Sequence, residues 1–340
     1  MTRSLPKIAL TMGDVTGIGP EVVARALNDR RLQECCRPVV VGHPEILQRA
    51  MALTGLEATL TVVSSPADID WDSSRIACWN PSTVELTLIP AGVTDPRAGR
   101  AAYDCLVAAT HAVLQGDMDA LTTAPLNKAA LHAAGLHFPG HTEILAAEGG
   151  VTEFAMLLHL PPGEWIQGIS GLGVAHVTLH TAIRHVPALL TVPRIRETVE
   201  LIDHFLKRIG CKTPRIGVCA LNPHAGEEGL FGDEESTLIS PAVEAAQKRG
   251  ILASGPLPAD ALLRRAIHGE FDGVAAMYHD QGHIALKLIG FEHAVNVTLG
   301  LPMIRTSPSH GTAFDIAWKG LARADGFIAA VRTAALLVHS

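Results

Sequence analysis

The segment YHDQGHIALKLIGFEHAVNVTLGLPMIRTSPSHGTAFD, residues 278–315, alternates polar side chains with short apolar runs. The apolar runs at 284–286 and 295–299 are typical of buried elements. Burying a polar group without a partner costs a few kcal/mol, so polar residues that recur at the ends of such elements indicate a functional site. The candidate ligating and anion-binding side chains of this segment are His279, Asp280, His283, Lys287, Asn296, Arg305, His310 and Asp315.

The composition is that of a folded protein with a large core. The chain has 340 residues, enough for two domains, and 48% of them are hydrophobic. A formal net charge of −7 argues against non-specific binding to nucleic acid or to an anionic membrane. Six cysteines without a CxxC pair indicate reduced core thiols. Because no signal peptide or membrane span is evident, we expect a cytoplasmic protein.

Strand and helix patterns alternate along the chain, which predicts a parallel α/β sheet. The first expected strand, 7–12, runs into GDVTGIGPE at 13–21, where Pro20 indicates a helix start. Such a loop can present backbone N–H groups to an anion, but its spacing is not GxGxxG. A phosphate cradle and a tight strand-to-helix connection are therefore both open interpretations.

A second helix start is expected in FPGHTEIL, residues 138–145. Thr142 is a good N-cap residue type, and His141 would lie beside it at the same helix end. The pattern is compatible with simple capping by Thr142 and with binding of an anion or substrate at this helix end.

Three histidines follow apolar strands at or beyond their carboxyl ends, where open α/β sheets collect functional side chains. They are His180, His224 and His279, and His180 shares an expected strand at 173–180 with His176. Three neutral imidazoles suit a divalent ion such as Zn²⁺, Co²⁺ or Mn²⁺ and leave open positions on it, whereas Mg²⁺ prefers oxygen. Asp280 or Asp260 could orient one of the rings.

Cations and an amide in the same region suit an anionic substrate. Arg305 is suited to bidentate recognition of a carboxylate or phosphate, and Lys287 to a point-charge contact. Lys287 lies between the apolar runs IAL and LIG, so we do not expect its side chain to be fully solvated. Asn296 completes this expected substrate-binding set.

Seven motifs in one order across nearly the whole chain resemble the 4-hydroxythreonine-4-phosphate dehydrogenase family of pyridoxal phosphate biosynthesis. They are GDVTGIGPE, TAPLNK, FPGHTE, LNPHAGE, GPLPAD, YHDQGH and NVTLGLPMIRTSPSHGTA. The resemblance implies two α/β/α domains with a cleft between them, as in isopropylmalate and isocitrate dehydrogenases. The first domain would comprise 1–139 plus 302–340, and the second, 140–301, would carry the metal ligands and a dimer interface.

The resemblance also implies the functional residues. A divalent metal (Zn, Co, Mn or Mg) would be held by His180, His224 and His279, at a homodimer interface where His279 comes from the other subunit. The phosphorylated substrate would contact His141, Thr142, Lys287, Asn296 and Arg305. A more distant similarity of SHGTAFDIAWKG, residues 309–320, to the adenosine-binding loop of isocitrate-type dehydrogenases implies NAD, or NADP, at His310, Gly311 and Thr312.

The activity implied is metal-dependent oxidation of the secondary alcohol of 4-phosphohydroxy-L-threonine by NAD. The product, a 3-oxo acid, would lose CO₂ to give 3-amino-2-oxopropyl phosphate. Lys287, His279 and Asp280 are the expected catalytic residues, with Lys287 or a metal-bound water as the base.

Alternative interpretations remain open within and beyond the family. Family paralogues act on 4-phosphorylated D-threonate or D-erythronate, or on aromatic cis-dihydrodiols, and Leu179, Glu228 and the segment 161–173 depart from the family pattern. A phosphate acyltransferase-like enzyme without a metal and a non-catalytic binding protein are alternatives of other classes. Metal dependence and NADH formation would separate them.

Overall fold

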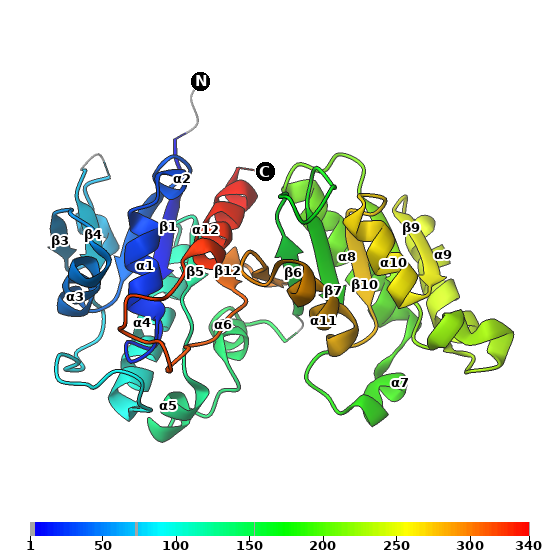
Figure 1. The fold of residues 1–340 in the computed structure, drawn as a ribbon, viewed down its shortest axis with the longest axis horizontal. Coiled ribbons are helices and arrows are strands. Elements are labelled where there is room, and N and C mark those ends of the chain that lie inside the picture. Colours follow the sequence, from blue (N-terminus) through cyan, green and yellow to red (C-terminus); the bar gives the residue numbers. More distant parts are fainter. Residues whose placement is uncertain (1–3, 72–73, 153, 340) are drawn as a thin grey trace. The chain divides into compact units, whose positions relative to one another are not determined.

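The computed structural model describes residues 4–71, 74–152 and 154–339, and the chain divides into two compact units (Figure 1). Unit 1 comprises residues 1–152 and 301–339, and unit 2 comprises residues 153–300. Each unit is a sheet with helices on both faces, so the predicted α/β class is confirmed.

The division between the units lies near residue 152 rather than after residue 139, because helix α6 (His141–Glu148) belongs to unit 1. Ile144 and Leu145 of this helix are fully buried in a cluster that also contains Leu106 and Leu121 of unit 1. The apolar side of α6 therefore places the division near residue 152.

The sheet of unit 1 is parallel, with the strand order β3-β4-β2-β1-β5-β12. Side chains alternate between its faces: Leu10 packs in one apolar cluster and Ala9 in another. The strands are β1 (Lys7–Thr11), β2 (Arg37–Val41), β3 (Leu60–Val63), β4 (Ile76–Trp79), β5 (Ala120–Thr123) and β12 (Arg305–Pro308). The helices are α1 (Gly19–Leu27), α2 (Arg30–Gln33), α3 (Pro44–Thr54), η1 (Pro66–Asp68), α4 (Pro96–Leu114), α5 (Lys128–Ala133), α6 and α12 (Asp325–Val338).

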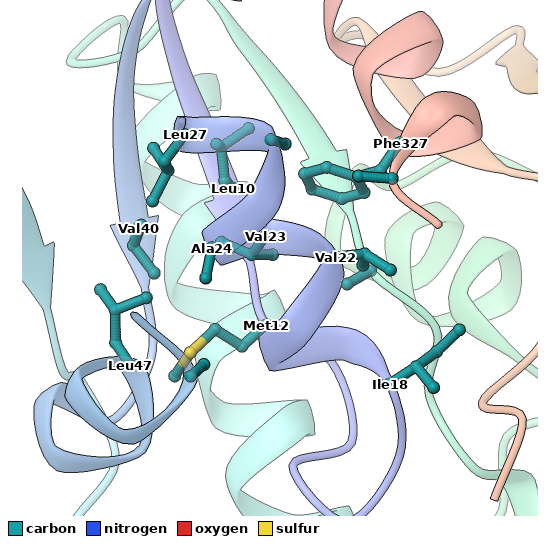
Figure 2. Packing of buried hydrophobic residues seen from close by; sticks show 14 of the residues in the cluster. Leu10, Met12, Ile18, Val22, Val23, Ala24, Leu27, Val40, Leu47 and Phe327 are labelled. Carbon is teal, nitrogen blue, oxygen red and sulfur yellow. The ribbon is translucent and has the colours of Figure 1, made fainter. Parts of the chain in front are cut away.

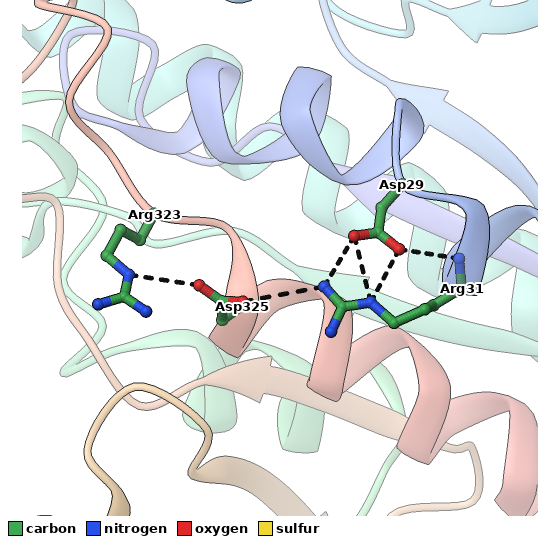
Figure 3. Close-up of polar contacts among 4 residues, drawn as sticks. All are labelled: Asp29, Arg31, Arg323 and Asp325. Carbon is green, nitrogen blue, oxygen red and sulfur yellow. Dashed lines mark hydrogen bonds and ion pairs between the residues drawn. The ribbon is translucent and has the colours of Figure 1, made fainter.

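Helix α12 brings the end of the chain into the core of unit 1. Phe327 is 0% exposed and lies in the same cluster as Leu10 and Val22 (Figure 2). An ionic network of Asp29, Arg31, Arg323 and Asp325 joins the start of α12 to α2 (Figure 3). These side chains are partly exposed, and such pairs contribute little stability. Apolar burial is therefore the main attachment of α12.

The sheet of unit 2 has the order β11-β6-β7-β10-β8-β9, with β6 antiparallel to both of its neighbours. Gly273 faces α8 and Val274 packs with α10 and α11, so helices cover both faces. The strands are β6 (Ala155–Leu160), β7 (Leu172–His176), β8 (Arg215–Cys219), β9 (Leu252–Leu257), β10 (Gly273–Ala276) and β11 (Val295–Leu299). The helical segments are η2 (Ile183–His185), α7 (Val186–Leu189), α8 (Val192–Arg208), η3 (Pro223–Gly229), η4 (Glu235–Ile239), α9 (Ser240–Gln247), α10 (Ala259–Ile267) and α11 (His279–Gly290).

Strand β7 is shorter than expected, because it ends at His176 rather than continuing to His180. The N–H groups of Val177 and Thr178 still bond to the carbonyls of Ala276 and Met277, after which the chain turns at 179–181. His180 therefore lies on a loop and does not share a strand face with His176. In the described part of the chain, no helix combines the length and apolar character needed to cross a membrane.

Replacing Phe327 by Ala should lower the free energy of unfolding by about 3–5 kcal/mol, because a fully buried ring would leave a cavity. Urea denaturation followed by circular dichroism measures the loss. Leu336→Ala is the control on the same helix; this side chain is 53% exposed, and a change within about 0.5 kcal/mol is expected. Equal losses in the two variants would contradict attachment of α12 through its buried face.

Candidate functional site

Two predicted metal-binding histidines meet at the carboxyl edge of the sheet in unit 2. His180 lies on the loop after β7, and His279 is the first residue of α11, directly beyond β10. Their ring centroids are 5.9 Å apart. Both line a cavity of ≈ 430 Å³, together with Tyr278 and Asp280. Because β7 and β10 are parallel neighbours, their ends bring the two imidazoles to one place.

Asp280 orients the ring of His279. Its Oδ1 lies 2.6 Å from Nδ1 of His279. With the proton on Nδ1, Nε2 is left with a free lone pair, as in metal-binding histidines whose other ring nitrogen donates to a carboxylate. The expected orienting role of Asp280 therefore agrees with its contact.

Two buried histidines, His176 and His283, lie beside the ring of His279. Nδ1 of His283 lies 3.1 Å from Nε2 of His176, and the rings of His283 and His279 stack with centroids 3.8 Å apart. Burial, with a smaller contribution from neighbouring histidines, lowers the pKa of His176 to about 3 and that of His283 to about 4. Both rings are thus neutral at pH 7. The His-x-x-x-His spacing of residues 279 and 283 is the sequence signal for the stacked pair, because residues four apart share a helix face.

His224 does not join this cluster within one chain. It is exposed on the loop after β8, and the nearest aromatic ring in contact with it is Phe231, with centroids 6.4 Å apart. Residues 224–228 all have positive φ, between 47° and 80°. Among residues 4–71, 74–152 and 154–339, no group of three His, Cys, Asp or Glu side chains could hold a metal ion. The expectation that three imidazoles converge is therefore not met by a single chain.

The pair that does meet fits a divalent cation. An ion bound to one nitrogen of each ring at ~2.0–2.1 Å would place the two centroids about 5–6 Å apart. The observed 5.9 Å lies in this range, and the free Nε2 of His279 is the required type of donor. His180 and His279 are thus two suitable ligands on a partly open cavity.

A separate group of residues in unit 1 suits an anion. Arg305, at the start of β12, is 2% exposed, and its Nη2 donates to Oγ1 of Thr123 at 2.7 Å. Burial lowers the pKa of Arg305 to about 10, so the side chain remains charged at pH 7. Burial, followed by the charge of Arg305, holds the pKa of the nearby His141 well below its usual range.

Helix α6 begins at His141, with Gly140 rather than Thr142 as the N-cap. The expectation of Thr142 as cap is therefore wrong, and Thr142 lies in the first turn. Gly140 makes no side-chain cap hydrogen bond. The first turn of α6 thus combines N–H groups that no N-cap side chain bonds with the nearby Arg305 cation. This arrangement favours negative charge, and Glu143 already lies in the turn.

The other two expected substrate residues lie in unit 2. Lys287 is half-buried on α11, with Nζ 5.8 Å from the ring of Phe291. Asn296 lies on β11, and its Oδ1 is buried with no hydrogen-bond partner among the described residues. An unpaired buried acceptor is costly, so this atom is a candidate for a ligand contact.

The expected cofactor residues His310, Gly311 and Thr312 lie on the loop after β12, packed on the Gly-rich loop of unit 1. The N–H of Ile18 donates to the carbonyl of Thr312 at 3.0 Å, and Nε1 of Trp318 donates to the carbonyl of Val15 at 2.8 Å. Nε2 of His310 is buried without a partner among the described residues.

The Gly-rich loop itself is a tight connection. The N–H groups of Asp14, Thr16, Gly17 and Ile18 all bond within the protein. A Cβ on Gly13, at φ 64°, would lie 2.2 Å from the carbonyl oxygen of Pro125. These contacts leave no N–H in 16–18 for a phosphate, so of the two open interpretations the tight connection is supported.

The pKa of the His141 imidazole should lie well below its usual 6.5, and Arg305→Met should raise this pKa by removing a neighbouring positive charge. The rise should be partial, because burial is the larger cause. Proton NMR titration of the histidine rings measures it. Arg323→Met, an exposed site in the same unit, is the matched control and should leave His141 unchanged. A wild-type His141 that titrates near 6.5 would contradict the buried environment.

Comparison with known proteins identifies the family. A family model described as pyridoxal phosphate biosynthetic protein PdxA matches residues 34–334. The chain is 43% identical to a D-threonate 4-phosphate dehydrogenase from Pectobacterium atrosepticum, over 96% of this chain and 98% of that protein. It is also 43% identical to a 4-hydroxythreonine-4-phosphate dehydrogenase from Geobacter metallireducens, over 98% of this chain and 96% of that protein. The crystal structure of a 4-hydroxythreonine-4-phosphate dehydrogenase from Klebsiella pneumoniae shares 40% identity and a TM-score of 0.85, with 100% of both chains covered. The chain therefore belongs to the PdxA family and is a dehydrogenase-like enzyme.

Proposed function

We propose that the protein is a metal-dependent NAD dehydrogenase that oxidises the secondary alcohol of a four-carbon, 4-phosphorylated acid. The observation that carries the proposal is the meeting of His180 and His279, with Asp280, on a cavity of ≈ 430 Å³. The family supports the reaction type, since relatives of equal identity are named as dehydrogenases of such compounds.

The overall reaction balances as an oxidation. The alcohol loses a proton and a hydride to become a ketone, and NAD⁺ becomes NADH. The resulting 3-oxo acid can lose CO₂, because the ketone accepts the electron pair of the breaking bond. When bound, a divalent ion supplies positive charge that lowers the pKa of the alcohol, and NAD⁺, or NADP⁺, supplies the hydride acceptor.

The chain's own residues bind and orient the substrate. Arg305 and the first turn of α6, with His141 and Thr142, would hold an anionic end by charge and N–H donation. The neutral His141 can donate or accept a hydrogen bond without adding charge. Lys287 is the candidate proton acceptor at the alcohol, and Asn296 supplies an acceptor for a substrate hydroxyl or amine.

The metal would be held by His180, His224 and His279, in a homodimer whose subunits share the site. His224 does not join the His180–His279 pair of one chain, so a second copy would complete the set, either with its His279, as the family resemblance implies, or with its His224. Helix α11, which begins at His279, exposes Ile284 (55%), Leu288 (82%) and Phe291 (48%) at helical spacing. An apolar stripe next to the site supports burial of this helix against another subunit.

Two substrates are the leading candidates. 4-Phosphohydroxy-L-threonine and 4-phospho-D-threonate share the phosphate, the C3 alcohol and the carboxylate, and the relatives named for them are both 43% identical to this chain. They differ at C2, which carries an amine in the first and a hydroxyl in the second. Any residue that selects between them must therefore contact C2.

NADH formation at 340 nm should be observed with one of these two compounds and a divalent metal. 4-Phospho-D-erythronate and an aromatic cis-dihydrodiol test the remaining family substrates, with NADP⁺ as the alternative acceptor. Exhaustive chelation should abolish turnover, and Zn²⁺, Co²⁺, Mn²⁺ or Mg²⁺ should restore it. Undiminished activity after chelation would contradict the metal, and no NADH from any of the four compounds would contradict the dehydrogenase.

Mixing two inactive variants tests whether the site is shared between subunits. If His279 is contributed by the other subunit, refolded mixtures of His180→Ala and His279→Ala should regain about a quarter of the wild-type activity, because half of the dimers are mixed and one of their two sites is intact. The control mixes His180→Ala with His224→Ala and should then regain nothing; recovery in this mixture instead would show that the other subunit contributes His224. No recovery in the first mixture would place His180 and His279 of one chain in one site, as their ring contact allows.

A further inference from the structure

A chain of hydrogen bonds crosses the bases of the three loops that carry the proposed metal ligands. Thr178, two residues before His180, donates through Oγ1 to the carbonyl of Met277 at 2.8 Å. Met277, two residues before His279, donates its N–H to Oε1 of Gln281 at 2.7 Å. Gln281 in turn donates from Nε2 to the carbonyl of Ala220, four residues before His224, also at 2.8 Å.

The side-chain amide of Gln281 joins the chains that follow β10 and β8, just beyond the point where the two strands stop pairing. Strands β10 and β8 are paired up to Ala275 and Val218, and beyond that point their chains diverge. A primary amide has one donor side and one acceptor side, so it can replace a peptide group between two diverging strands. The two residues that it joins are themselves fixed, because the N–H of Ala220 bonds to Leu257 and the carbonyl of Met277 receives two bonds from Thr178.

The loop beyond Ala220 transmits this position to His224. Oε1 of the buried Glu235 accepts the N–H groups of Leu221 at 2.9 Å and Asn222 at 2.8 Å, and Oε2 accepts from Nδ2 of Asn222 at 3.0 Å. The following residues, 224–228, are held at positive φ, which only a well-supported loop sustains. A displacement at Ala220 would therefore be carried to His224 rather than absorbed.

We propose that Gln281 is a positioning residue that sets the location of the His224 loop relative to His180 and His279. Gln281 is not itself one of the proposed ligands, and its side chain bonds to the backbone of Met277 and Ala220. Its role rests on the proposed function, because the positions it sets matter only if these histidines bind one metal ion. A purely local alternative is that Gln281 caps the start of α11, since it is the third residue of that helix.

Gln281→Glu breaks the network at one atom. The variant keeps the acceptor for the N–H of Met277, and with it the local cap, but replaces the donor to Ala220 by a carboxylate oxygen that faces a carbonyl. Gln281→Ala removes both bonds without this repulsion. Gln247→Glu is the matched control, because Nε2 of Gln247 donates to the carbonyl of Ala253 at the same 2.8 Å in the same unit, beside β9.

The measurements are the affinity of the full-length protein for Co²⁺ and the visible absorption spectrum of the bound ion, with melting temperatures for all variants. Gln281→Glu and Gln281→Ala should bind Co²⁺ at least about tenfold more weakly and shift its absorption band, as loss of supporting contacts does at metal sites. Gln247→Glu should bind as wild type does, even if its melting temperature falls equally.

The outcomes separate the inference from the proposed function. Wild-type affinity and an unchanged spectrum in either Gln281 variant would overturn the positioning role and leave a cap. If Gln281→Glu fails to fold, Gln281→Ala decides on the same two readouts. A wild-type protein that binds no Co²⁺, or whose binding is unaffected by His180→Ala, His224→Ala and His279→Ala, would overturn the proposed metal site itself, and the inference with it.

Discussion

The parallel alignment of β7, β10 and β8 is the constraint on which the histidine site depends. Strands that run in the same direction end at the same edge, so the loops after them start from one line. The strands are fully buried except at Arg215 and hold their places by apolar packing on both faces. The histidines that must be placed accurately relative to one another thus lie on loops that begin at fully buried strands of unit 2.

Two buried histidines at this edge of the sheet are uncharged. His176 and His283 lie under His279, and burial keeps both uncharged at pH 7. Charged imidazolium rings at these distances would oppose a cation, whereas neutral rings pack beneath it at no electrostatic cost. In unit 1 the buried Arg305 stays charged beside the neutral His141, and the carboxylate of Glu143 also acts on this guanidinium.

Much of this arrangement was predictable from local sequence, and its failures have physical reasons. His180 and His279 were expected at strand ends because each follows an apolar run, and the structure places them there. The length of β7 was not predictable, because it is ended by the turn at 179–181 rather than by a local breaker. Thr142 has a better capping side chain than Gly140, yet the burial of Ile144 and Leu145 decides where α6 begins and to which unit it belongs. The bridge from Gln281 to Ala220 spans 61 positions and depends on which strands are neighbours, a property that no single segment encodes.

Because the ribosome synthesises the chain from its N-terminus, the two units can complete their folds at different times. Unit 2 is one continuous stretch and can fold as soon as residue 300 has emerged. Unit 1 must wait, because β12 and α12 come last and until then the edge of β5 has no neighbour on that side and the pocket for Phe327 is open. Arg305 belongs to that late strand. A chain that stops short of β12 retains the histidine edge but lacks the buried cation, so unit 1 gains this charge only after Arg305 has joined its sheet.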